Sequence, residues 1–386
     1  MLSRKKMIIY IIVCVLILLS ISGCWNRREL NTLAILMGMG IDKAQETGKI
    51  ELTAQVIKPG ELKQEARTGE KAYWNIKKTG STVFNTIRGF TFESSRKIFL
   101  QHSQVLIFGR ELAEEGVQNH LDFFIRDHET RLTVDVLVAE GKAADILDVK
   151  SEIEKIPANN IANLVEAYGA TSQSISVSLD EFIKRLMSKT FSPIAPIIRV
   201  NNDGEKQSVF LEGTAVFKRA KMVGELNRIE TRGLLWVIDK IRSGIIVINS
   251  PDGEGNVEFE IIRASSKIIP KIENNRISLT VKIKEEGNIG SQNSPGDLEL
   301  EHIEYFENEK KSVIKNEVMA AISKAQELNA DIFGFGEAIY RKYPKQWKEL
   351  EENWDKIFPE LEVEIIVEAR VKRSGVSLKP VIPGKE

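Results

Sequence analysis

The sequence predicts an α+β protein made of several mixed domains, in which helices cover sheets that are at least partly antiparallel. Three observations support this fold class. Apolar and polar residues alternate in several short segments, as they do along half-buried strands. Other segments carry apolar residues at helical spacing, and the longest of these is expected to form a helix over residues 311–328. The chain has no repeat of fixed period, so strands and long helices are mixed along it.

Composition limits the classes of function. The chain has 386 residues, which exceeds the usual size of one domain and predicts two or three. Hydrophobic residues make up 42% and charged residues 28%, which is typical of a folded protein and excludes both a disordered chain and a polytopic membrane protein. The 54 basic and 55 acidic residues are mixed along the chain, so there is no electrostatic indication of nucleic-acid binding.

Residues 1–23 have the pattern of a lipoprotein signal peptide. A basic start, MLSRKK, precedes an uninterrupted apolar run from Met7 to Leu19. A membrane-spanning helix needs about 20 apolar residues, so this run is short for one. An uncleaved N-terminal anchor is the alternative interpretation.

The end of this segment explains an isolated cysteine. Residues 21–24 read Ile-Ser-Gly-Cys, which resembles the bacterial lipobox, where the cysteine receives diacylglycerol. On this interpretation Cys14 leaves with the signal peptide and Cys24 becomes the lipidated N-terminus, so the mature chain has neither a free thiol nor a disulfide. One acyl chain gives only reversible membrane binding, whereas two or three hold stably. We therefore expect the folded part to lie outside the cytoplasm, against a membrane.

The N-terminal region, residues 24–205, is expected to alternate strands and helices in two subdomains. Strands are predicted at 51–57, 97–109 and 131–141, and helices at 81–90, 117–127 and within about 158–185. The inward positions of these segments are apolar: Val83, Ile87 and Phe90, then Leu121, Phe124 and Ile125, then Val134, Val136 and Val138. Two prolines and a polar, glycine-containing stretch at 192–207 indicate a boundary.

The C-terminal domain, residues 206–386, is predicted to mix the same elements. The expected segments are a hairpin over 213–226 that turns at Arg219-Ala220, a helix over 230–244 that ends at Gly244, half-buried strands over 276–287 and 361–373, and the 311–328 helix. Pro344 separates a short helix from one whose inward residues are Trp347, Leu350, Trp354 and Ile357, and Pro359 ends that helix. Helices covering a sheet would follow from this order.

Metal binding is not indicated. The chain has four histidines, His102, His120, His128 and His302, and no two of them have the i, i+4 spacing with which a helix presents two metal ligands. His120 and His128 flank a predicted amphipathic helix, where a solvated histidine is the expected role. No metal and no cofactor is therefore predicted.

Other motifs also favour structural roles over catalytic ones. Gly334-Phe335-Gly336 begins like a dinucleotide-binding loop, but Ile339 stands where the third glycine belongs. The stretch 249–260 is a polar turn, because Ile261 replaces the acid that would complete a calcium loop. Three acids, Glu362, Glu364 and Glu368, share one strand face, where a solvated face is favoured over a glycosidase pair. The aromatic residues Tyr340, Tyr343, Trp347 and Trp354 are expected to pack in the core rather than to form a binding surface. No catalytic constellation is found, so the chain is not predicted to be an enzyme.

Four blocks of sequence resemble the Ger(x)C family of spore germination lipoproteins, the C subunits of nutrient germinant receptors. They are GCWNRRELNTLAILMGMGID at 23–42, SSRKIFLQHSQVLIFGRELAEEGVQNHLDFFIRD at 94–127, GTAVFKRAKMVGELNRIETRGLLWVI at 213–238 and ADIFGFGEAIYRKYPKQWKELEENWDKIFPELEVEI at 330–365. The likeness runs from Cys24 to about Ser377. Asn26 departs from the aspartate expected at its position and does not affect the lipid-bearing Cys24.

The resemblance implies a lipoprotein on the outer surface of the inner spore membrane, with three α+β domains and no known enzymatic activity. It implies two integral-membrane partners, the A-type and B-type receptor subunits, and nutrient binding falls more naturally to these than to the C subunit. Cys24 is the one functional residue that carries over. Two hypotheses from other classes stay open: a lipid-anchored solute-binding protein that captures the nutrient itself, and a hydrolase of the spore cortex.

Overall fold

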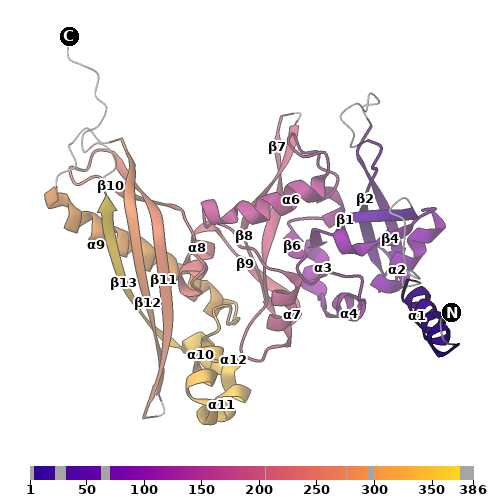
Figure 1. The fold of residues 1–386 in the computed structure, drawn as a ribbon. Coiled ribbons are helices and arrows are strands. Elements are labelled where there is room, and N and C mark those ends of the chain that lie inside the picture. The colour runs from indigo at the N-terminus through magenta and orange to yellow at the C-terminus, as the bar shows by residue number, and fades with distance from the viewer. Residues whose placement is uncertain are drawn as a thin grey trace.

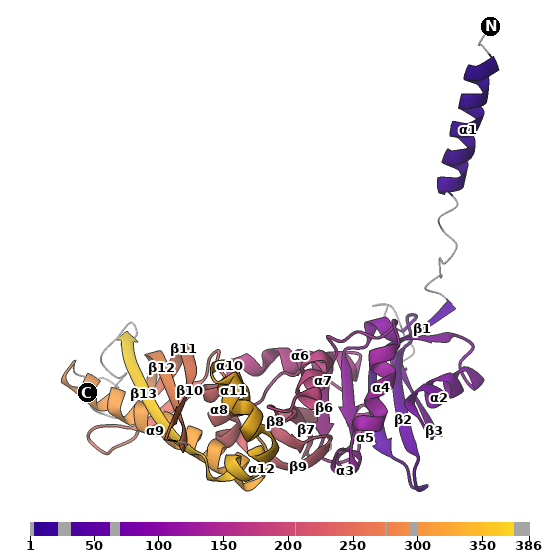
Figure 2. The same ribbon diagram turned by 90° about the horizontal axis from the view of Figure 1, so that it is seen from below.

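The structure is a computed structural model that describes residues 4–21, 32–61, 70–204, 206–274, 276–293 and 300–373. Two sheets follow one another along an elongated body, with helices packed against both (Figures 1 and 2). Mixed sheets and helices confirm the predicted α+β class.

The described part of the predicted signal peptide forms helix α1, Arg4–Ile21. Its first three residues are basic and the rest of its length is mostly apolar. Among the helices that the structure describes, none is both long and apolar enough to cross a membrane.

The first sheet has nine strands and is parallel at its centre. Its strands are β1 (Leu33–Lys43), β2 (Ile50–Ile57), β3 (Tyr73–Gly80), β4 (Lys97–Phe99), β5 (Val105–Phe108), β6 (Asp135–Ala139), β7 (Ile194–Asp203), β8 (Lys206–Lys218) and β9 (Lys221–Leu226). The order is β3-β2-β1-β5-β6-β7-β8-β9, and β4 pairs with the start of β1. Strands β1, β5, β6 and β7 run parallel, whereas both flanks are antiparallel.

Helices cover both faces of the first sheet. They are α2 (Val83–Gly89), α3 (Arg110–Glu115), α4 (Gln118–Arg126), α5 (Ala143–Ile146), α6 (Pro157–Glu166) and α7 (Leu179–Met187). Along β5, Leu106 and Phe108 enter one core together with residues of α2, α4 and α7. Val105 and Ile107 enter a second core with residues of α5 and α6. A parallel sheet with two covered faces gives central strands that are apolar throughout.

The second sheet has four strands and is covered on one face. Its strands are β10 (Ile245–Asn249), β11 (Asn256–Glu273), β12 (Arg276–Gln292) and β13 (Glu362–Arg373), in that order. Its helices are α8 (Arg228–Val237), α9 (Ile303–Glu327), α10 (Phe335–Lys342), α11 (Pro344–Leu350) and α12 (Trp354–Ile357). In β12, Leu279, Val281 and Ile283 are buried, and Lys282 and Lys284, which alternate with them, are exposed, as predicted.

The structure corrects several predicted elements of the N-terminal region. The single strand predicted at 97–109 is two strands, β4 and β5, separated by a 3-10 turn at Leu100–His102. Both run parallel to β1, one beside its first residues and one beside its later half. Ile125 was predicted to point inward and is 54% exposed, because the buried stripe of α4 runs through Leu121 and Phe124.

Further differences lie near the predicted domain boundary. Residues 194–203 form strand β7, in which Pro196 falls at a register shift that removes the need for its N–H. The proposed division at 205/206 lies at the tip of the β7–β8 hairpin, so the first sheet continues through it to β9.

Two helix ends also differ from the prediction. Helix α8 ends at Val237 rather than at Gly244, because Asp239 adopts a left-handed conformation with φ of 61°. Helix α9 begins at Ile303, earlier than the predicted start at residue 311.

Candidate functional site

Cys24, the residue expected to carry the lipid, lies outside the described residues. The structure resumes at Thr32, immediately before β1. Lipidation of Cys24 therefore stays a prediction from the sequence.

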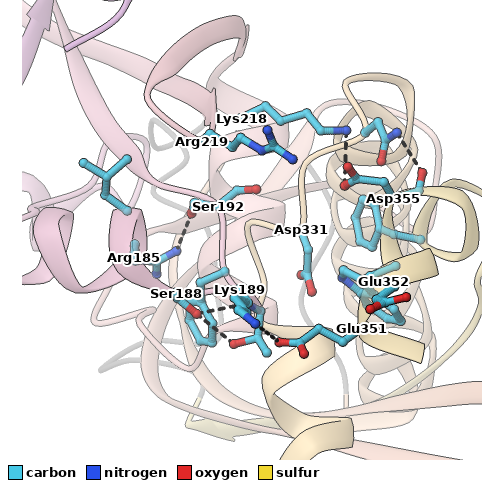
Figure 3. Close-up of a pocket in the computed structure, with 16 residues that line it drawn as sticks. Arg185, Ser188, Lys189, Ser192, Lys218, Arg219, Asp331, Glu351, Glu352 and Asp355 are labelled. Atoms are coloured by element: carbon cyan, nitrogen blue, oxygen red, sulfur yellow. Dashed lines mark hydrogen bonds and ion pairs between the residues drawn. The ribbon is translucent and has the colours of Figure 1, made fainter. Parts of the chain in front are cut away.

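A cleft of about 430 Å³ opens where the first sheet meets the C-terminal helices (Figure 3). One wall comes from the end of α7, the segment 188–192 and the turn between β8 and β9. The other comes from residues 329–331 after α9 and from residues 351–358. Segments that are far apart in sequence thus form one polar cleft.

The base of the cleft is built around the buried carboxylate of Asp331. It accepts hydrogen bonds from the backbone N–H groups of Gly334 at 2.9 Å, Phe335 at 3.1 Å and Gly336 at 2.8 Å. Burial raises the pKa of Asp331 to about 6, against the lowering effect of these three N–H groups. A protein carboxylate therefore occupies the N–H cradle at the start of α10 that a phosphate would need.

This arrangement explains the glycines that resemble a dinucleotide loop. Gly334 has φ of 80°, and a Cβ there would lie 2.3 Å from the ring of Phe191. Glycine is required for both reasons, left-handed backbone and close approach. The N–H groups of the Gly334-Phe335-Gly336 stretch, at the start of α10, bind the Asp331 carboxylate. The glycines therefore have a structural role, as the sequence indicated.

Arg185 joins the two sides of the cleft from within. Its side chain is 7% exposed, and its Nη1 donates to the carbonyl oxygens of Ser192 at 3.3 Å and Ile332 at 3.1 Å. Its Nε donates to Glu181 at 3.2 Å, and its guanidinium lies 5.1 Å from the centre of the Phe191 ring. A buried charge satisfied by this many partners favours a fixed junction between the two sheets.

Two ion pairs bridge the walls near solvent. Lys189 Nζ lies 3.3 Å from Glu351 Oε1, and Lys218 Nζ lies 3.3 Å from Asp355 Oδ1. Arg219 stands at the left-handed turn after Lys218 with φ of 54° and, within the described chain, has no ion-pair partner. The cleft thus offers charges of both signs to a polar molecule, and its side chains are held mainly by one another.

The described lining of the cleft brings together no recognisable catalytic pair or triad. Among the acids of the cleft, Asp331 has the most strongly shifted pKa, and its carboxylate oxygens already accept hydrogen bonds from backbone N–H groups. Elsewhere in the described ranges, no group of three potential metal-ligating residues converges.

His120 and His128 were both expected to be solvated beside a helix, and the structure corrects this for His120. His128 is exposed, as expected. His120 lies inside α4 rather than beside it and is half-buried, and burial lowers its pKa. Its Nδ1 has no hydrogen-bond partner among the described atoms.

The acids and aromatic residues considered for function also have structural roles. Glu362, Glu364 and Glu368 are exposed on one face of β13, as predicted. Glu364 accepts a hydrogen bond from Thr280, and Glu368 forms an ion pair with Lys284. Trp347 and Trp354 are buried in the core, which confirms their predicted packing, whereas Tyr340 is 48% exposed.

The fold and the cleft define an elongated α+β protein with a polar junction between its two sheets, and comparison identifies its family. Residues 26–200 match the model of the spore germination protein N-terminal domain. Residues 212–375 match the model described as spore germination B3/GerAC like, C-terminal. The chain belongs to this GerAC-like family of spore germination proteins.

Individual relatives agree with this assignment. The chain is 28% identical to spore germination protein KC of Bacillus subtilis, over 96% of this chain and 97% of that one. It is 24% identical to spore germination protein B3 of the same species, over 93% and 96%. The crystal structure of the GerBC protein has the same fold, with a TM-score of 0.59 and 20% identity over 86% of this chain and 96% of that one.

Proposed function

We propose that this chain is a non-catalytic, lipid-anchored subunit of a spore nutrient germinant receptor. It acts with integral-membrane A-type and B-type subunits at the extracytoplasmic face of the inner spore membrane. The observation that carries the proposal is the match to both family models, which begins at residue 26, two positions after Cys24.

The anchor has a physical role in this proposal. A basic start, an apolar run and a small-residue approach to Cys24 fit a lipoprotein signal. Two or three acyl chains at Cys24 hold the subunit stably on the membrane. Membrane attachment raises the effective concentration of the subunit around its membrane-embedded partners without any new contact.

The described fold suits a subunit that transmits contact rather than one that performs chemistry. Two hydrogen bonds join the segments of the two sheets: Arg185 donates to the carbonyl oxygen of Ile332, and the Ser192 N–H donates to the backbone carbonyl oxygen of Asp331. A partner that binds one end of such a body also orients the other end. No separate catalytic step is needed for this role.

The proposal is tested by comparing the two cysteines. Cys24→Ala, expressed at the native level, is expected to release the protein from spore membranes and to weaken germination on nutrients. Cys14→Ala is the matched control, because Cys14 leaves with the signal peptide, and it is expected to leave both readouts unchanged. Normal membrane attachment and germination of Cys24→Ala spores would contradict the proposed anchor.

Capture of a nutrient by this subunit is a second candidate function. The cleft between the two sheets, with both signs of charge, is the observation that favours it. Titration of candidate amino acids and sugars into the detergent-solubilised full chain tests this function. Saturable binding that is lost in Lys218→Met would support direct capture, and no binding would leave recognition to the membrane subunits.

A cortex hydrolase is the weaker alternative. The acids that such an enzyme could use on β13 lie on an exposed face, where Glu368 is paired with Lys284 at 3.1 Å. Cleavage of purified cortex peptidoglycan by the full chain would overturn the non-catalytic proposal.

A further inference from the structure

An exposed aromatic stripe runs along α2 and the 3-10 turn that continues it at Phe90–Phe92. Phe92 is 89% exposed and Phe84 is 50% exposed. Arg88 lies between them in sequence, and its guanidinium is 5.1 Å from the centre of the Phe84 ring. Phe84 and Arg88 are spaced by four residues and lie on one side of α2, and Phe92 follows in the 3-10 turn.

A third aromatic residue extends this surface onto the neighbouring sheet edge. Trp74 lies on the edge strand β3 and is 41% exposed. Together with Glu93, Ser94 and Arg96 it lines a groove of about 390 Å³. The groove therefore places Trp74 beside the segment that directly follows Phe92.

The surface carries positive charge that the protein does not neutralise. Lys78 pairs with Glu93 beside the groove. Arg88 and Arg96, by contrast, have no hydrogen bond or ion pair from their guanidinium groups to any residue that the structure describes. Exposed phenyl and indole rings next to free guanidinium groups match the chemistry of a lipid headgroup region.

The position of the surface in the chain also favours a bilayer. Strand β4 begins at Lys97, five residues after Phe92, and Lys97 is the register partner of Leu33 at the start of β1. From Thr32 back to Cys24 the chain has eight residues, which reach at most about 29 Å when fully extended. If Cys24 is lipidated as proposed above, the bilayer cannot lie farther than this from the start of β1. Figure 1 shows α2 and β4 at the same end of the body as β1, and Figure 2 shows α2 at that end as well.

We propose that the membrane-facing surface, formed by Trp74, Phe84, Arg88, Phe92 and Arg96, rests on an anionic lipid bilayer beside the anchor. The rings enter the headgroup region, and the two guanidinium groups bind lipid phosphates. The anchor then fixes the distance of the protein from the membrane, and this surface fixes its orientation. The inference rests on the proposed lipidation of Cys24.

The experiment places an environment-sensitive dye next to the surface and at a matched remote position. Ser95→Cys adjoins the groove, and Ser208→Cys lies in the β7–β8 hairpin; both serines are exposed. Both variants carry Cys14→Ala, and the full lipidated chain is reconstituted into vesicles with nitroxide-labelled lipid, with or without phosphatidylglycerol. We expect at least twofold stronger quenching at position 95 than at position 208 in the anionic vesicles.

Substitutions on the surface separate its two parts. Phe92→Ser combined with Phe84→Ser is expected to remove the difference in quenching between the two dye positions. Arg88→Gln combined with Arg96→Gln is expected to weaken quenching at position 95 in anionic vesicles only. Equal quenching at positions 95 and 208 in the parent protein would overturn the proposal. If the dye at position 95 responds only when the integral-membrane subunits are present, the proposal would also be overturned, in favour of a protein partner.

A separate control shows whether Cys24 is lipidated. The parent chain without an added cysteine takes up no thiol dye if Cys24 is lipidated, and it floats with the vesicles. If it takes up dye and fails to float, lipidation is wrong. In that case both variants also carry Cys24→Ala, and the difference in quenching between positions 95 and 208 on added anionic vesicles tests the surface. Equal quenching would contradict it.

Discussion

The two sheets of this molecule differ in how they are covered, and the difference determines where the chain tolerates change. Every residue of β5 in the first sheet is buried, and successive residues enter two separate cores. In the second sheet one face packs on α8 and α9, and the other exposes residues such as Val247, Ile262 and Ile366. The central strands of the first sheet are thus covered on both faces (the closed sheet), whereas the second sheet has one uncovered face (the open face of the open sheet).

The largest effect is expected on the covered face of the second sheet. Lys310 of α9 and Glu285 of β12 are both 0% exposed, with Nζ and Oε2 2.8 Å apart. Lys310→Met leaves the carboxylate buried without its partner, which is expected to lower the free energy of unfolding at pH 7 by about 3–5 kcal/mol. Chemical denaturation measures the loss.

Two variants control this prediction. Lys284→Met removes an exposed partner of Glu368 on the open face and is expected to cost less than about 1 kcal/mol. The double variant Lys310→Met, Glu285→Leu is expected to recover much of the lost stability, because no unpaired charge remains. Equal losses at positions 310 and 284 would mean that the two faces do not differ as described.

The next largest effect is expected for an isoleucine in the first sheet, compared with an isoleucine on the open face of the second. Ile107 in β5 is fully buried, and Ile366 in β13 is 37% exposed on the open face. Ile107→Ala is expected to cost about 2–5 kcal/mol through lost burial and the cavity that it leaves. Ile366→Ala is expected to cost less than half as much in the same denaturation assay; similar costs would show that the open face is covered in the native protein.

A smaller effect depends on pH and belongs to the first sheet. Burial raises the pKa of Asp135 to about 6, and the Ser176 hydroxyl lowers it in part. The folded state therefore binds this proton more tightly than the unfolded chain, so ionisation destabilises the fold as pH rises from about 4 to above 6. Asp135→Asn is expected to make the unfolding free energy fall less steeply over this range. An unchanged slope would assign the pH dependence to another group, such as Asp331.

The smallest effect is expected at the mouth of the cleft. The Lys218–Asp355 pair has side chains that are 29% and 62% exposed, so salt and water screen it. Lys218→Met is expected to change the free energy of unfolding by less than about 1 kcal/mol. Arg185→Met, at the buried centre of the same junction, provides the contrast and is expected to cost several times more.

Two strands of the open sheet were predictable from the sequence, and the closed sheet was predictable only in part. Strands β10 and β11 were not predicted, and residues 256–260, expected in a polar turn, form the start of β11. Strict alternation at 276–287 and 361–373 marks strands with one buried face, and both strands form as expected. In the segment 97–109, Leu100 of the 3-10 turn is buried like Ile98 of β4 and Val105 of β5, so the apolar pattern alone could not separate the two strands. Strand β7 was missed because Pro193 before it and Pro196 within it resemble a linker, and only its pairing with β6 and β8 makes it a strand.

The cleft could not be predicted, because its charged residues come from segments that only the fold brings together. Lys189 and Glu351 carry no sequence signal that relates them. The base of the cleft has no capping signal either, because Asp331 lies three residues before Gly334, the N-cap residue of α10, and meets its N–H donors through the bend of the loop. The lipidation site has the opposite character, because its evidence lies wholly in local sequence.

Germination of spores that lack this one gene tests the central claim most directly. The mutant and parent spores are compared on a panel of amino acids and sugars, and on a trigger that bypasses nutrient receptors. A receptor subunit predicts the loss of response to particular nutrients with the bypass response intact. An unchanged response to every nutrient, in spores whose related receptor genes are also deleted, would contradict the account.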